Sequence, residues 1–193
     1  AANKSYKPLN KTNCIEYIKN KYSIDSPFIL YIGGFSTRKN VKELIIAFNK
    51  IQKSLKKNYK LVLCGSIRDE GIKLQELCKE LLMDDKIIFT GFVPDDELPL
   101  FYNAAEVFIY PSSYEGFGLP PLEAMSCATP VITSNLTSIP EVTKDCAILI
   151  NPFDKDELAS SILTLLNSES LLQEYSEKGY NNSLNFTWEN TAI

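Results

Sequence analysis

Six short apolar segments alternate with longer segments in which apolar residues recur every three or four positions. Short apolar runs are typical of buried strands, and the three- and four-residue recurrence is typical of helices that pack one face on a sheet. Alternation of the two favours parallel strands joined by helical crossovers. The chain is therefore predicted to be α/β, with a Rossmann-like open parallel sheet of about six strands and helices on both faces.

The positions of these elements follow from the same pattern. The expected strands cover residues 28–33, 60–64, 86–89, 107–110, 131–133 and 147–150. The expected helices cover residues 41–55, 74–82, 98–105, 154–166 and 168–182. One more helix is expected to begin at Pro120-Pro121, because proline suits the first helical turn, where its missing N–H would be unpaired in any case.

Both ends of the chain differ from this core pattern. Residues 1–25 are predicted to be a linker or N-terminal extension, residues 26–182 the domain itself, and residues 183–193 the start of a truncated C-terminal helix, with Thr187 as its N-cap. We therefore expect an excised domain. No run of 18 apolar residues occurs and the polar start does not resemble a signal peptide, which favours a soluble, cytoplasmic protein.

Charge is distributed unevenly, with +10 on residues 1–60 and −14 on residues 61–193. A basic segment can face phosphates, an acidic partner domain or a membrane surface. A solvated helix face explains the same charge, since the lysines of the first long helix fall mostly opposite its apolar stripe. No aromatic–basic interleaving is present, so nucleic-acid binding is not expected. The five scattered cysteines, without a C-x-x-C pair, favour reduced thiols over disulfides or zinc.

The ligand crevice of an open parallel sheet lies at the carboxyl ends of its strands. The loop after the first expected strand contains Gly33 and Gly34, which let the backbone approach a ligand, and Arg38 and Lys39, which can neutralise a phosphate. A tight strand-to-helix turn with solvated cations explains these residues equally well. The loop after the third expected strand contains Gly91, Phe92 and Val93, which could hold a flat base or simply form a turn.

Residues 110–125 (YPSSYEGFGLPPLEAM) are the most informative segment for function. Glu115 lies in a glycine-bearing loop, and Glu123 follows about one turn into the next helix. Pro120 and Pro121 have no N–H, so an anion would be bound by the N–H groups of Gly116, Phe117, Gly118 and Leu119. Glutamates bind neutral hydroxyls, and a phosphate with hydroxyls beside it describes a sugar nucleotide. For Glu123, a helix-capping or dipole role is the alternative.

These motifs resemble those of retaining, GT-B-fold glycosyltransferases of the large "group 1" family. The two glutamates, separated by seven residues, resemble the family's paired-glutamate signature. The similarity also includes residues 31–40, residues 90–93 and residues 129–142, in the same order along the chain. It covers roughly residues 28–182.

The resemblance implies the C-terminal, donor-binding domain of a two-domain enzyme, inactive by itself because the acceptor site and a catalytic histidine belong to the missing N-terminal domain. Glu115 would lie beside the donor sugar as the catalytic residue, Glu123 would hold the ribose hydroxyls, and Lys39, with Arg38 beside it, would bind phosphate. The donor would be a GDP- or UDP-sugar, used without a metal or other cofactor in cell-surface polysaccharide synthesis. The full-length enzyme could contact the inner face of the membrane peripherally.

Two residues depart from the family pattern. Gly34 stands where many members have an arginine, which leaves more of the phosphate charge to Arg38 and Lys39. Ala128 stands where glycine is usual, and a left-handed backbone there would strain alanine by roughly 1 kcal/mol. Three alternatives share the fold: a sugar-nucleotide epimerase, a phosphorylase and a non-catalytic nucleotide-sugar-binding module. The absence of histidine and the E-G-F-G-L spacing favour neither of the other enzymes.

Overall fold

A single parallel sheet organises the chain, and the computed structural model describes residues 2–186 of it. The six strands lie in the order β3-β2-β1-β4-β5-β6, and every neighbouring pair is parallel. The strands are β1 (Phe28–Ile32), β2 (Lys60–Cys64), β3 (Ile87–Gly91), β4 (Val107–Tyr110), β5 (Val131–Ser134) and β6 (Ile148–Ile150). The predicted fold class and all six strands are confirmed; β2 and β4 have the predicted ends, and the other four are shifted at one or both ends by one or two residues.

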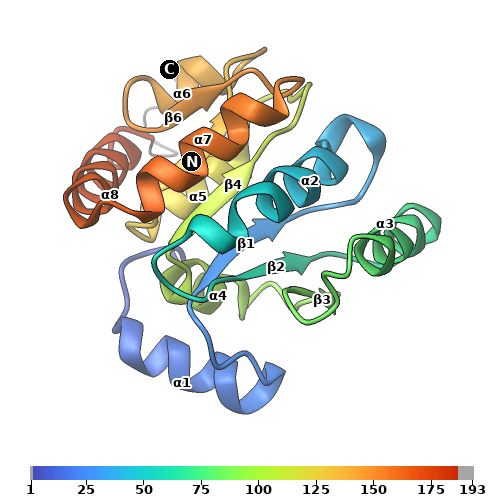
Figure 1. Cartoon of the computed structure of the whole chain (residues 1–193). Coiled ribbons are helices and arrows are strands. Elements are labelled where there is room, and N and C mark those ends of the chain that lie inside the picture. Colours follow the sequence, from blue (N-terminus) through green and yellow to red (C-terminus); the bar gives the residue numbers. More distant parts are fainter. Residues whose placement is uncertain (1, 187–193) are drawn as a thin grey trace.

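The helices connect these strands as the α/β pattern requires. They are α1 (Lys11–Tyr22), α2 (Val41–Ile51), α3 (Asp69–Glu80), α4 (Leu98–Ala104), α5 (Leu119–Ser126), α6 (Ile139–Thr143), α7 (Lys155–Leu166) and α8 (Glu169–Ser183). Short 3-10 turns precede and follow α2, namely η1 (Thr37–Lys39) and η2 (Gln52–Ser54). Helix α2 packs along α7 on one face of the sheet, and α5 packs on α4 and α8 on the other (Figure 1).

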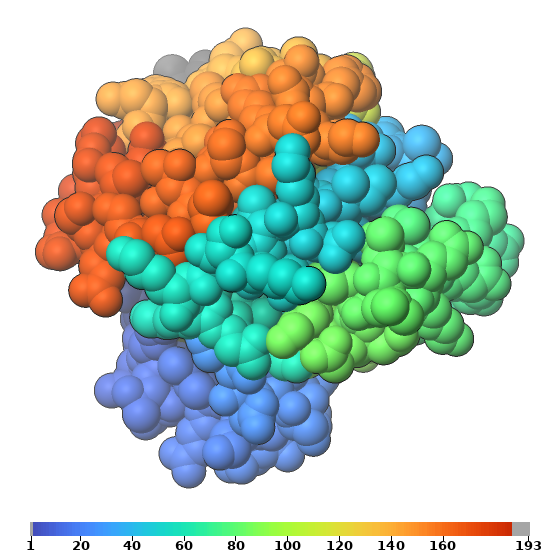
Figure 2. Space-filling view, in the orientation of Figure 1, coloured from blue at the N-terminus to red at the C-terminus, as the bar shows by residue number. Residues whose placement is uncertain are grey.

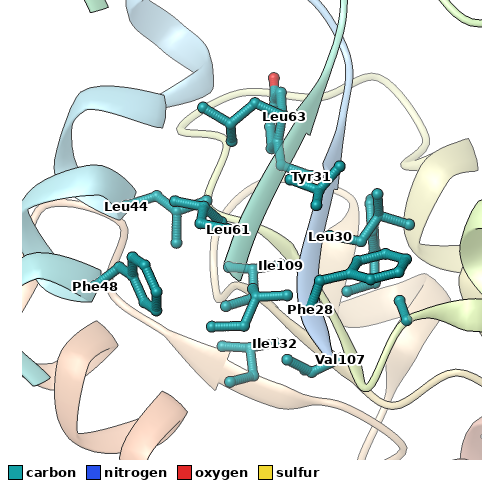
Figure 3. Close-up of a cluster of buried hydrophobic side chains, with 14 of the residues drawn as sticks. Phe28, Leu30, Tyr31, Leu44, Phe48, Leu61, Leu63, Val107, Ile109 and Ile132 are labelled. Carbon is teal, nitrogen blue, oxygen red and sulfur yellow. The ribbon is translucent and has the colours of Figure 1, made fainter. Parts of the chain in front are cut away.

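The core lies where α2 covers the sheet. Strands β1, β2 and β4 are almost wholly buried, as expected for parallel strands covered on both faces. Figure 3 shows Leu44 and Phe48 of α2 pointing toward Leu61 and Ile109 of the sheet, and all four side chains are fully buried. The three- and four-residue recurrence in the sequence thus marks the face of α2 that packs on the strands.

The lysines of the α2 region lie on the opposite face. The side chains concerned are exposed to solvent, namely Lys42, Lys50, Lys53, Lys56 and Lys57. Two of them reach the C-terminal half of the chain, since Lys50 pairs with Asp156 at 2.8 Å and Lys56 donates to the carbonyl of Asn167 at 2.8 Å. Figure 2 shows the blue-to-teal α2 region lying against the orange α7 on this face. A solvated face of the α2 region therefore accounts for five of the 13 basic residues among residues 1–60.

Residues 1–25 include a helix that packs on the domain, where we expected a linker or extension. Asn10 caps the start of α1 by accepting from the N–H of Asn13, and Ser23 ends it in a left-handed conformation. Cys14 and Ile18 are buried against the core, and α1 lies along α4. The sequence pattern missed this helix because only two of its twelve residues are buried.

Three further expectations concern the rest of the chain. Helix α8 ends at Ser183, and the expected helix start at Thr187 lies outside the described residues. All five cysteines are free thiols, four of them buried, including Cys127. Within residues 2–186, no helix combines the length and the apolar character needed to cross a membrane.

Ala128 has the left-handed backbone that would favour glycine, with φ of 58°. We predict that Ala128→Gly raises the free energy of unfolding by about 1 kcal/mol, because it removes the strain of a Cβ in this conformation. Ala159→Gly in the middle of α7 is the matched control, and it should lower stability by a similar amount, about 1 kcal/mol. Urea denaturation of both variants tests the pair, and equal losses of stability would contradict the assignment of strain to Ala128.

Candidate functional site

The strand order reverses between β1 and β4, and the candidate site lies there. Strand β1 pairs with β2 on one side and with β4 on the other, although β4 comes much later in the chain. The helices that follow these two strands, α2 and α5, lie on opposite faces of the sheet (Figure 1). At such a switch point neither helix covers the carboxyl ends of the strands, which leaves a crevice between the two loops.

The first loop turns sharply after β1 and presents Lys39 toward the second. Gly33 has φ of 152°, and a Cβ there would lie 2.9 Å from the hydroxyl of Tyr31, so no larger residue fits. Asn40 then adopts a left-handed conformation, and its side-chain amide donates to the carbonyl of Pro111 at 3.1 Å. These contacts fix the short η1 turn that carries Lys39.

Arg38 contributes to the site through its backbone as well as its charge. Its side chain is exposed to solvent. Its carbonyl accepts from the N–H of Ser113 at 2.8 Å and from the hydroxyls of Ser112 and Ser113 at 3.3 and 3.0 Å. The backbone of the first loop therefore anchors the loop that follows β4, while the guanidinium is exposed to solvent.

Glu115 lies in the loop after β4 and accepts three side-chain hydrogen bonds. Its Oε1 accepts from Lys39 Nζ at 2.5 Å, from Ser112 Oγ at 2.6 Å and from the Tyr110 hydroxyl at 3.0 Å. Lys39 also donates to the Tyr110 hydroxyl and lies 4.8 Å from the centre of that ring. Only 12% of the Lys39 side chain and 13% of the Glu115 side chain are exposed, so this ion pair is largely shielded from water.

Although burial opposes ionisation, hydrogen bonds from Lys39 and Ser112 hold the pKa of Glu115 below its ordinary value. Glu115 is therefore a carboxylate at neutral pH, with its negative charge matched by Lys39. The loop around it is tied to the next part of the chain, since the Glu115 N–H donates to Thr137 Oγ1 at 3.2 Å and its carbonyl accepts from Ser138 Oγ at 3.0 Å.

The glycine segment after Glu115 offers backbone donors. Gly118 precedes α5 with φ of 91°, and a Cβ there would meet Ile139 Cδ1 at 2.5 Å. Within residues 2–186, the N–H groups of Gly116, Phe117 and Gly118 donate to no acceptor. Leu119 begins α5, and the prolines after it occupy the first turn as predicted. Free N–H groups at a helix start form a suitable anion-binding surface.

Glu123 lies in α5 in an environment opposite to that of Glu115. Its Oε2 accepts from the Tyr102 hydroxyl at 3.1 Å, and no basic side chain within residues 2–186 forms an ion pair with it. Burial raises the pKa of Glu123, an effect that the Tyr102 hydrogen bond only partly opposes, and the charge of Asp95 adds to the rise.

A cavity of about 640 Å³ opens beside these loops at the ends of β1, β2 and β3. Gly33 and Gly34 of the first loop, Phe92 and Val93 of the loop after β3, and Asp95 line it. Phe92 is 71% exposed at its rim, whereas Val93 is buried. The two glutamates and Lys39 lie outside its lining. The structure thus places the predicted residues at one sheet edge but in two adjacent regions.

Several residues of this site were missed by sequence reasoning. Tyr110, Ser112 and Tyr102 bind the two glutamates, yet in the sequence they read as the end of a strand, a loop and a helix. Thr137 and Ser138 were missed because they lie more than twenty positions from Glu115. The tyrosines could have been recognised because the hydroxyl of a buried tyrosine usually forms a hydrogen bond with a polar partner.

Comparison with known proteins identifies the family of this chain. The family model of glycosyl transferases group 1 matches residues 15–182. O-antigen chain mannosyltransferase B of Escherichia coli is 36% identical over 190 residues, which is 98% of this chain and 50% of that protein. The chain therefore belongs to the group 1 glycosyltransferases, and it spans about half the length of this curated relative.

Solved structures show the same fold. Sucrose-phosphate synthase from Thermosynechococcus elongatus matches with a TM-score of 0.84 and 28% identity, over 100% of this chain and 48% of that one. The C-terminal domain of a glycosyl transferase group 1 family protein (LpcC) from Francisella tularensis matches with a TM-score of 0.82 and 25% identity, over 96% of this chain and 97% of that one. The six-stranded sheet is therefore the Rossmann-like half of a GT-B fold.

The opposite environments of the two glutamates predict opposite effects on stability. At pH 7, Glu115→Gln should lower the free energy of unfolding by about 2 kcal/mol, because Lys39 loses its anionic partner in a shielded site. Glu123→Gln should raise it by about 1 kcal/mol, because it removes a carboxylate whose ionised form is disfavoured by burial. Urea denaturation measures both, with Glu16→Gln on the exposed face of α1 as control.

The pH dependence follows from the direction of each pKa shift. The stability from ionised Glu115 is present above its ordinary pKa of 4.5 and is lost as the pH falls through the lower folded value. The destabilisation from Glu123 is absent below its ordinary pKa of 4.5 and develops as the pH rises toward the raised folded value. Both differences from wild type should therefore shrink in acid, and differences of the same sign at pH 7 would contradict the assignment.

Proposed function

We propose that this chain is the donor-binding half of a retaining glycosyltransferase. It binds a nucleoside-diphosphate sugar, either a GDP- or a UDP-sugar, and the complete enzyme transfers the sugar to a saccharide or lipid-linked acceptor in cell-surface polysaccharide synthesis. Mannose is the sugar that the similarity to O-antigen chain mannosyltransferase B supports. The relative's greater length supports a second, acceptor-binding domain in the complete protein. We further propose that it acts in the cytoplasm, with peripheral contact at the inner face of the membrane.

The observation that carries this proposal is the shielded Lys39–Glu115 pair beside the free N–H groups of Gly116, Phe117 and Gly118. A diphosphate needs cationic and N–H donors, and the sugar next to it needs acceptors for its hydroxyls. Because the sugar is attached to the diphosphate, the cation that binds the diphosphate and the carboxylate that binds the sugar must be neighbours. The 2.5 Å contact between Lys39 and Glu115 satisfies this condition.

In the proposed complex, Lys39 and the free N–H groups bind the diphosphate, with the exposed guanidinium of Arg38 approaching it from solvent. As the bond to the sugar breaks, negative charge develops on the leaving diphosphate and positive charge on the sugar ring. Prearranged donors stabilise the first charge, and the Glu115 carboxylate stabilises the second. Retention follows if the acceptor attacks from the face of the departing diphosphate, which takes up the acceptor proton.

The chemistry proposed here uses no metal ion. Within residues 2–186, no three acidic, cysteine or histidine side chains are grouped so that they could hold one. The positive charge of Lys39 supports the proposal, because it supplies at the diphosphate the electrostatic stabilisation that a metal provides in other enzymes.

Glu123 is proposed to accept hydrogen bonds from the ribose hydroxyls, with the base in the cavity lined by Phe92 and Val93. We predict that the chain binds GDP or UDP and that Glu123→Ala weakens this binding about tenfold, since a hydrogen bond to a charged group contributes roughly 1.5–3 kcal/mol. Isothermal titration calorimetry measures both, with Glu16→Ala as an unaffected control. Absence of binding of either nucleotide at millimolar concentration would refute the donor-binding proposal.

Glu115 is proposed to act on the sugar and not on the nucleotide. In the complete protein supplied with donor and acceptor, Glu115→Gln should reduce release of nucleoside diphosphate at least a hundredfold, on the order of the loss seen when one preorganised electrostatic group is removed. Nucleotide affinity of the folded variant should stay within a few-fold of wild type. Turnover equal to wild type would exclude the proposed role of Glu115.

A further inference from the structure

The segment ahead of α1 (residues 2–10) is bound to α4. Asn103 holds it, because its Oδ1 accepts from the Leu9 N–H at 2.7 Å and its Nδ2 donates to the carbonyls of Lys7 and Pro99 at 3.1 and 2.8 Å. Asn103 is only 7% exposed, so these bonds form in the protein interior. A buried amide with its donor and acceptor both satisfied specifies one position for the segment.

This course brings Tyr6 to Glu123. The rings of Tyr6 and Tyr102 pack edge to face with their centres 5.8 Å apart, and the Tyr102 hydroxyl donates to Glu123. The Tyr6 hydroxyl is near enough to the same carboxylate for the two groups to shift each other's pKa. Burial, and then the charges of Glu123 and Asp95, raise the pKa of Tyr6. Asp95, whose charge also raises the pKa of Glu123, lines the 640 Å³ cavity.

We propose that Tyr6 is a positioning residue that orients the Glu123 carboxylate for ribose recognition. The segment ahead of α1 would then complete a nucleotide site whose other residues come from loops at the sheet edge and from α5. The inference rests on the proposed function, since it assumes that Glu123 binds ribose hydroxyls.

The hydrogen-bonding capacity of the carboxylate supports this role. An ionised carboxylate has about four acceptor positions and no donor, so it can accept from Tyr102 and Tyr6 and still accept from two ribose hydroxyls. Because no basic side chain of the described part of the chain pairs with Glu123, the orientation of its carboxylate depends on these phenols. Two aromatic rings in contact restrict the motion of both hydroxyls, which fixes the carboxylate before a ligand arrives.

Tyr6→Phe tests the inference, since it removes the hydroxyl and keeps the ring that packs on Tyr102. The 193-residue chain is titrated with GDP and UDP and with the 2′-deoxy form of each. Wild type should bind the better ribonucleotide more tightly than its 2′-deoxy form. Tyr6→Phe should weaken binding of that ribonucleotide three- to tenfold and weaken binding of the 2′-deoxy form, which retains only the 3′-hydroxyl, by a smaller factor. Tyr102→Phe should act in the same direction.

Tyr59→Phe is the matched control, because Tyr59 is a buried tyrosine whose hydroxyl has no hydrogen-bond partner within residues 2–186. It should change neither affinity. Equal weakening of both forms by Tyr6→Phe would show a merely structural role and overturn the inference, as would unchanged affinity. Tighter binding would show that Tyr6 occupies the ribose position, which also overturns it. A wild-type chain that binds no nucleotide, or does not distinguish ribose from deoxyribose, would refute the proposed function of Glu123 itself.

Discussion

The reversal of strand order between β1 and β4 is the constraint on which the rest of the site depends. Because α2 and α5 leave these neighbouring strands on opposite faces, the two loops must approach each other across an open crevice. The carbonyl of Arg38 and the amide of Asn40 then hold the second loop by its backbone. Lys39 lies between these two anchors, so its contact with Glu115 is a consequence of the sheet topology.

The two glutamates of one motif lie in opposite electrostatic environments. Glu115 is matched by Lys39 and has a lowered pKa, whereas Glu123 accepts from the Tyr102 hydroxyl, has no basic partner within residues 2–186 and has a raised pKa. A carboxylate that stays ionised beside a cation can stabilise positive charge that develops during a reaction. A carboxylate without a cationic partner is suited to accept hydrogen bonds from neutral hydroxyls. An unmatched buried charge lowers stability, which is a frequent property of residues retained for binding.

The strands and the placement of the two glutamates could be predicted from the sequence, whereas helix α1 and the contact of Lys39 with Glu115 could not. Periodicity located all six strands, and the spacing from Glu115 to Glu123 placed both glutamates correctly on a loop and in a helix. Periodicity failed for α1, whose buried face consists of Cys14 and Ile18. Periodicity also could not predict the direct contact of Lys39 with Glu115. These residues are 76 positions apart, and their proximity follows only from the order of the strands in the sheet.

The tyrosines show most clearly why the site and the core cannot be separated. The rings of Tyr31, Tyr110, Phe108 and Tyr102 follow one another with centres 6.0, 5.9 and 5.1 Å apart. The hydroxyl of Tyr110 binds Glu115 and that of Tyr102 binds Glu123, so this one series of core rings supports both carboxylates. Protein interiors are packed as tightly as organic crystals, so a side chain that is part of such packing has a fixed position. The packing of the core therefore sets the positions of the two glutamates. For this reason Tyr110 and Tyr102 are residues of both the core and the site.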